Sequence, residues 1–128
     1  MSLINDKVYT QEDEALLSTL LLSVGIMPSK AGFRYLKTSV LIYKKFNGNM
    51  SAICTYVAKN NNVSKDSVER DMRTAIENAC RRGWFKRFNE IIGVNFLEDG
   101  EKLKTKEFIA IVVEYLDDPR SKKSLLKY

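Results

Sequence analysis

The most regular pattern of apolar and polar positions in the chain lies between Ser64 and Gly83. Its apolar residues recur at helical spacing and form a single stripe of Val68, Met72, Ala75, Ile76 and Ala79. Ser64 is suited to cap the first turn, and Gly83 is suited to the left-handed position that follows a last turn. The segment is therefore predicted to be a helix with one buried face, and Glu69, Arg70 and Arg73 lie on its exposed face.

Apolar residues at the same spacing predict helices on both sides of this segment, over residues 11–24, 29–46, 50–59, 84–92 and 106–116. Gly25 and the asparagine-rich runs at 47–49 and 60–62 are typical of the turns between helices, and Thr105 is suited to cap the last one. Residues 94–104 are irregular, and a small hairpin around Asp99-Gly100 is an alternative there. The chain is predicted to be one all-α domain of about six helices over residues 11–118, with a flexible arm at 1–10 and a basic tail at 119–128.

The order of elements around residues 50–83 is a short helix, a polar turn and a longer helix. That order is typical of a helix-turn-helix unit, in which the second helix enters the major groove of DNA. The sequence therefore predicts that the segment from Ser64 is a recognition helix.

Length and composition fit one globular domain, because 45% of the 128 residues are hydrophobic and 29% are charged. No apolar run is long enough to span a membrane, and the start does not have the pattern of a signal peptide. We therefore expect a cytoplasmic protein.

Charge is distributed unevenly along the chain. The net charge of +5 favours a polyanionic partner without requiring one. Residues 1–28 carry a net charge of −3, whereas residues 59–87 carry +4. The basic excess thus lies on and around the predicted recognition helix.

The residue types available for catalysis or metal binding are few. Histidine is absent, and two isolated cysteines, Cys54 and Cys80, cannot form a four-ligand zinc site. Both are interpreted as reduced core residues. The carboxylates at Glu12-Asp13-Glu14 and Asp117-Asp118 fall at helix ends, where they suit the helix dipole or terminate the helix. We expect neither an enzyme nor a bound metal or cofactor.

Candidate base contacts are Arg70 and Arg73, since arginine donates two hydrogen bonds to O6 and N7 of guanine. Glu69 can accept from N4 of cytosine or orient an arginine. The alternative is a solvated helix face that includes an ion pair between Arg73 and Glu77.

Candidate phosphate contacts lie at both ends of the same helix and just before it: Lys59, Ser64, Lys65, Ser67, Arg81, Arg82 and Lys86. For the serines, helix capping is the competing interpretation, and for each cation it is ordinary surface placement. Tyr35, Trp84 and Phe88 are better explained as core residues than as residues that stack on bases.

Several segments occur in the order seen in one known family: Gly25-Ile26, the run at 32–36, Val57-Ala58-Lys59, the run at 68–77, Arg82-Gly83 and the run at 107–110. Over about residues 14–116 the chain resembles the C-terminal effector domain of the stage-zero sporulation response regulators of endospore-forming bacteria. The resemblance implies a six-helix domain with a helix-turn-helix that binds short operator boxes, often as tandem copies, with Glu69, Arg70 and Arg73 facing the bases. A homodimer is the alternative to a tandem arrangement.

The chain departs from that family at three points. The loop before residue 50 is shorter, and Cys54-Thr55 replaces a Tyr-Pro step. Thr74 stands where a histidine often follows the second arginine. The receiver domain of the family is absent from these residues. Two hypotheses follow: a sequence-specific regulator that binds double-stranded DNA and controls transcription in sporulation, or a non-catalytic protein-interaction module on the same fold.

Overall fold

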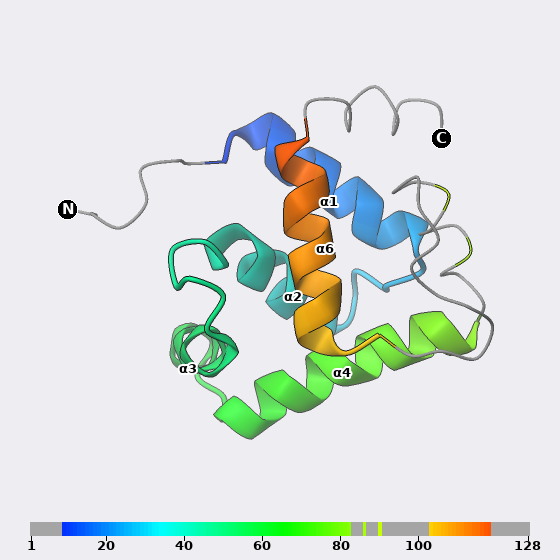
Figure 1. The fold of residues 1–128 in the computed structure, drawn as a ribbon. Coiled ribbons are helices and arrows are strands. Elements are labelled where there is room, and N and C mark those ends of the chain that lie inside the picture. The colour runs from blue at the N-terminus through cyan, green and yellow to red at the C-terminus, as the bar shows by residue number, and fades with distance from the viewer. Residues whose placement is uncertain (1–8, 83–85, 87–89, 91–102, 119–128) are drawn as a thin grey trace.

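The computed structural model describes residues 9–82, 86, 90 and 103–118, and the regular structure within these residues is entirely helical. Its five helices are α1 (Gln11–Ser23), α2 (Ala31–Ile42), α3 (Met50–Asn61), α4 (Lys65–Arg81) and α6 (Thr105–Asp117) (Figure 1). The predicted all-α class is confirmed. The helix predicted over 84–92 lies outside the described residues except for Lys86 and Glu90, and so does most of the irregular segment 94–104.

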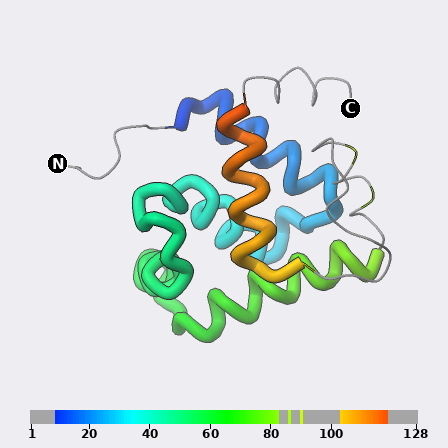
Figure 2. Tube along the Cα trace, viewed as in Figure 1, coloured from blue at the N-terminus to red at the C-terminus, as the bar shows by residue number. Residues whose placement is uncertain are grey.

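Helix α2 is central, because it contacts α1, α3, α4 and α6. Figure 2 shows α6 crossing α2 and reaching α4 at its lower end. The five helices share one core whose largest fully buried side chains include Leu17, Leu20, Leu36, Ile53, Met72 and Phe108. Among the described residues no helix combines the length and apolar character that a membrane span needs.

Helix α1 closely follows its prediction, and both of its ends are stabilised locally. At the start, Thr10 and Asp13 form a capping box in which each side chain accepts a hydrogen bond from the other residue's backbone N–H. At the end, Gly25 takes a positive φ of 83°. The N–H of Ile26 then donates to the carbonyl of Leu21 at 3.0 Å, the pattern of a Schellman motif.

The predicted limits of α2 are wrong at both ends. The helix begins at Ala31 because Lys30 is extended (φ −99°, ψ 148°) and serves as its N-cap. After Ile42 the backbone enters successive turns, in which Asn47 and Gly48 both have positive φ. The prediction extended α2 through Phe46 because the apolar spacing continues past the true end of the helix.

Helices α3 and α6 also differ from their predictions. Helix α3 extends to Asn61, since only Asn62 takes the left-handed conformation that ends it (φ 55°, ψ 44°). Thr105 is the first residue of α6 rather than its cap. Lys104 is the N-cap, and its N–H donates to Oε1 of Glu107 at 3.1 Å.

Tyr9 joins the start of the described chain to the end of α6. Its hydroxyl donates to Oδ1 of Asp117 at 3.4 Å, and Oδ2 of Asp117 forms an ion pair with Lys44. Burial, followed by the negative charge of Asp117, raises the pKa of Tyr9 to about 12. Asp117 therefore connects three distant parts of the chain.

This contact predicts how stability changes at alkaline pH. The folded-state pKa of Tyr9 exceeds its ordinary value of 10.0, so its contribution to stability is fully present below pH 10 and is lost as pH rises through about 12. Urea unfolding across this range should show the free energy of unfolding falling more steeply for the wild type than for Tyr9→Phe. The other tyrosines are common to both proteins, so parallel curves would contradict the assignment.

Candidate nucleic-acid interface

Helices α3 and α4 are joined by a three-residue turn, Asn62-Val63-Ser64. Asn49 caps α3 by accepting from the N–H of Ala52 at 3.1 Å, and Asn62 ends it. The Ser64 hydroxyl then accepts from the N–H of Ser67 at 3.0 Å, so the predicted N-cap of α4 is confirmed. Local side-chain chemistry thus fixes where each of these two helices begins and where α3 ends.

The inner face of α4 is buried as the apolar stripe predicted. Val68, Met72, Ile76 and Ala79 are no more than 1% exposed. Gly32 of α2 lies directly on this helix: a Cβ placed there would be 2.6 Å from the carbonyl oxygen of Asp71. Contacts this close leave α4 little freedom to shift relative to the core.

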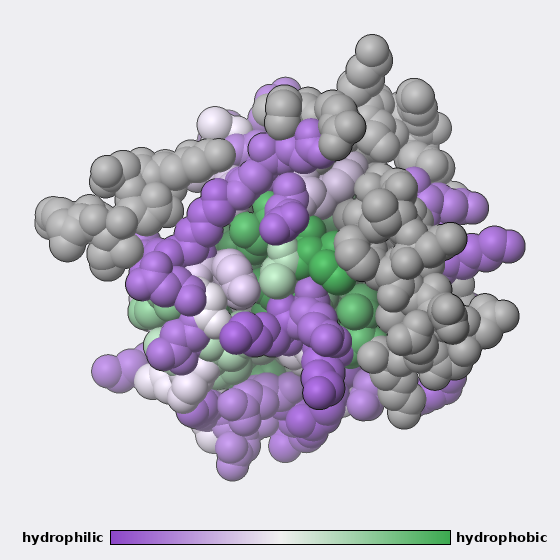
Figure 3. Space-filling model, viewed as in Figure 1, coloured by the Kyte–Doolittle hydropathy of each residue, from purple (hydrophilic) through white to green (hydrophobic). Residues whose placement is uncertain are grey.

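Helix α4 is held on two opposite sides. On one side Lys65 Nζ donates to Ser51 Oγ of α3 at 2.6 Å. On the same side, Glu69 of α4 acts electrostatically on Cys54 of α3: burial, and after it the negative charge of Glu69, raises the pKa of the Cys54 thiol. On the other side lies the start of α2, which meets α4 at Gly32. Between these neighbours the charged face of α4 points into solvent, and Figure 3 shows the mostly hydrophilic surface over this helix.

The three predicted base contacts are all exposed on α4, but their surroundings differ. Arg70 is tethered, since Nη2 donates to Ser67 Oγ at 3.3 Å and Nε lies 3.6 Å from Asp71 Oδ1. The side chain of Arg73 forms neither a hydrogen bond nor an ion pair with any described residue, and the alternative pairing with Glu77 is not made there. The guanidinium of Arg73 is therefore available to a partner.

The predicted phosphate contacts do not form one cluster. Four lie at the junction of α3 and α4: Lys59, Ser64, Lys65 and Ser67. Three of these already bond within the protein, because Ser64 Oγ donates to Ser67 Oγ at 2.9 Å and Lys65 reaches Ser51. Arg81 and Arg82 lie at the far end of α4, roughly 24 Å away at 1.5 Å per residue. Lys86 is exposed beyond that end.

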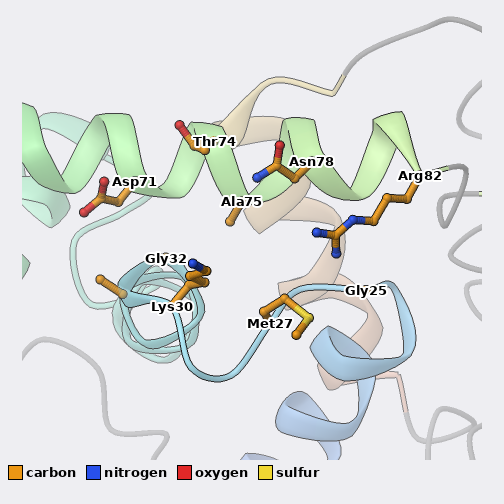
Figure 4. A pocket seen from close by; sticks show the side chains of 10 residues that line it. Gly25, Met27, Lys30, Gly32, Asp71, Thr74, Ala75, Asn78 and Arg82 are labelled. Atoms are coloured by element: carbon orange, nitrogen blue, oxygen red, sulfur yellow. The ribbon is translucent and has the colours of Figure 1, made fainter.

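One feature of this region escaped sequence reasoning. A groove of about 250 Å³ runs between α4 and the chain that enters α2, and Lys30, Asn78 and Arg82 are among its lining residues (Figure 4). Arg82 was predicted only as a surface phosphate contact, and the other two were not singled out. The only sequence signal is Gly32, whose missing side chain leaves the room for this close approach.

No group of three or more His, Cys, Asp or Glu side chains within the described residues is placed to hold a metal ion. Cys54 is buried, Cys80 is partly buried, and neither is in a disulfide. The arrangement can bind a partner through charges and hydrogen bonds.

The fold and this surface define the class: an all-α domain that presents a charged helix after a three-residue turn. A family model described as sporulation initiation factor Spo0A, C terminal, matches residues 17–116, which include α2, α3, α4 and nearly all of α6. The chain belongs to this family of DNA-binding regulatory domains. The predicted resemblance to sporulation effector domains is thereby confirmed.

Proposed function

We propose that this chain is a sequence-specific regulator of transcription in sporulation, and that α3, the turn and α4 form the helix-turn-helix with which it binds double-stranded DNA. Membership of the Spo0A C-terminal family supports DNA binding and regulation in general. The observation that carries the specific assignment is Arg73, an exposed cation without a partner among the described residues, on a helix whose opposite face is fully buried. The role is binding, without catalysis or a cofactor.

In this proposal α4 lies in the major groove. Arg70 and Arg73 donate to O6 and N7 of guanine, and Glu69 accepts from N4 of cytosine or orients an arginine. Lys59, Ser64, Lys65 and Ser67 bind phosphates at the start of α4, Arg81 and Arg82 bind them at its far end, and Lys86 binds one beyond that end. Copies of the domain bind adjacent operator boxes, as a homodimer or in tandem.

The test is a fluorescence anisotropy titration of two labelled duplexes across a salt series. One duplex carries an operator box of the family and the other carries the same bases scrambled. We expect the operator to bind at least about three decades more tightly than the scrambled duplex, the usual range for a specific regulator. Equal affinity for both would contradict the base contacts, and no binding even at low salt would favour the protein-interaction module.

Ser67 is predicted to position Arg70 for this readout, because its hydroxyl accepts from Arg70 Nη2 at 3.3 Å. Ser67→Ala removes that bond but keeps the backbone N–H that Ser64 caps, so α4 should remain capped. The loss of this hydrogen bond should weaken binding to the operator by about 0.5–1.5 kcal/mol more than binding to the scrambled duplex in the same titration, because the phosphate contact of Ser67 is common to both duplexes. Equal weakening of binding to both duplexes would instead mean that Ser67 acts only as a phosphate contact and does not position Arg70.

A further inference from the structure

We propose that the groove between α4 and the chain entering α2 binds a backbone phosphate of the operator, on the side of α4 that faces away from α3. Lys30, Asn78 and Arg82 are its contacts. This inference rests on the proposed function, and it assigns a role in DNA binding to Lys30 and Asn78.

The groove is built from two distant parts of the chain. Its walls include Met27 and Lys30 from the segment before α2, and Asp71, Thr74, Asn78 and Arg82 along one edge of α4. Figure 4 shows the Arg82 guanidinium pointing back toward the segment that carries Met27, with Lys30 beneath α4. Its volume of about 250 Å³ has room for a phosphate group.

The electrostatics of the groove favour an anion. Neither Lys30 nor Arg82 forms an ion pair or side-chain hydrogen bond with any described residue. The negative charge of the Asp71 carboxylate, which also lines the groove, is balanced by Arg70, because Asp71 Oδ1 lies 3.6 Å from Arg70 Nε. Asn78 Oδ1 accepts from Arg81 Nη1 at 3.0 Å, which leaves the amide NH₂ of Asn78 as a donor. Two cations without a partner among the described residues therefore share one recess with an amide donor.

The protein groove lies where the second of the two phosphate backbones that border the DNA major groove would be. Helix α4 contacts α3 on one side through Lys65 and Ser51, and it contacts the start of α2 on the other through Gly32. A helix with side chains is about 10–12 Å wide, and the major groove is about 12 Å wide. When α4 fills the major groove of DNA, the protein elements on both sides of α4 therefore meet a phosphate backbone. The recess at Lys30 faces the strand opposite to the one near Lys65.

The salt dependence of binding tests this assignment with Lys30→Gln, Arg82→Gln and the double variant. The matched control is Lys45→Gln, since Lys45 is an exposed cation in the turn between α2 and α3. Each groove variant should reduce the slope of log K against log salt by about 0.9, and the double variant by about 1.8. Binding to the operator and binding to the scrambled duplex should weaken alike, by about fivefold in affinity per lost contact near 0.15 M salt. Arg82→Lys should retain the slope, because it retains the charge.

A second measurement locates the phosphate. Operators that carry a neutral methylphosphonate at one position at a time are titrated with the wild type, Lys30→Gln and Lys65→Gln. Neutralising the phosphate that a lysine contacts should weaken binding by the wild type but not by the variant that lacks this lysine. We expect the phosphate found in this way for Lys30 to lie on the strand opposite to the one found for Lys65. Coupling of both lysines to the same strand would overturn the inference.

The outcomes separate this inference from the proposed function. If the wild type prefers the operator but the groove variants keep its salt slope, as Lys45→Gln should, the groove does not bind DNA and the recognition helix stands. That result would leave the recess to a free anion or an acidic peptide. If the wild type binds neither duplex at low salt, the proposed function fails and this inference fails with it.

Discussion

Arg73→Ala should weaken binding to the operator by about 1–3 kcal/mol, which is roughly 5- to 150-fold in affinity, and should leave binding to scrambled DNA almost unchanged. A bidentate arginine–guanine contact discriminates between bases, so its loss affects only the cognate sequence. The fold should not suffer, because Arg73 is exposed and lacks a side-chain partner among the described residues. Alanine is also a better helix former than arginine.

The measurement for Arg73 is anisotropy against operators in which each base pair is substituted in turn. The wild type should be penalised at every contacted position, and Arg73→Ala should lose the penalty at a single position. Lys86→Ala is the informative comparison, because Lys86 is exposed and is proposed to contact a phosphate. Loss of such a contact should weaken binding to all duplexes equally and flatten the salt slope. If Arg73→Ala behaved like Lys86→Ala, Arg73 would be a phosphate contact and the readout would belong to other residues.

The charged helix was predictable because its determinants are local. Apolar residues at helical spacing defined the buried face of α4, and Ser64 defined its start. Both features depend on residues within one or two turns of each other. The exposure of Arg73 followed from the same periodicity, so the sequence was sufficient to predict which side chains a partner can reach.

The ends of α2 and α3 were less predictable because competing local signals are nearly equal. Residues 60–62 are all asparagine, and any of them tolerates the left-handed conformation that ends a helix. At the end of α2, the apolar spacing continues beyond Ile42, although the backbone there forms turns.

The groove and the tether on Arg70 were not predictable for different reasons. Lys30 and Asn78 are far apart in sequence, and only the packing of α2 on α4 brings them together. The hydrogen bond from Arg70 to Ser67 is local, but spacing alone does not distinguish it from the pairing of Arg73 with Glu77. Side-chain geometry was needed to separate a positioned arginine from a free one.

Gly32→Ala should destabilise the protein although alanine is the better helix former by about 1 kcal/mol. The new Cβ would be 2.6 Å from the carbonyl oxygen of Asp71 and 2.8 Å from Cβ of Ala75. Neither atom can rotate away, so α2 and α4 would have to separate. Overpacking of this kind costs about 1–3 kcal/mol, and Gly32→Val should lie at or above the upper end. Thermal and urea unfolding measure both effects.

The double variant Gly32→Ala/Ala75→Gly isolates the cause. It removes the contact with Cβ of Ala75 but keeps the one with Asp71, so it should recover only part of the loss after allowance for Ala75→Gly alone. Unchanged or increased stability of Gly32→Ala would mean that the helices separate at little cost. Because α2 and α3 hold opposite sides of α4, moving α2 would also change how far α4 projects beyond its neighbours. Loss of operator preference in a variant that stays folded would therefore show that the spacing at Gly32 serves recognition as well as stability.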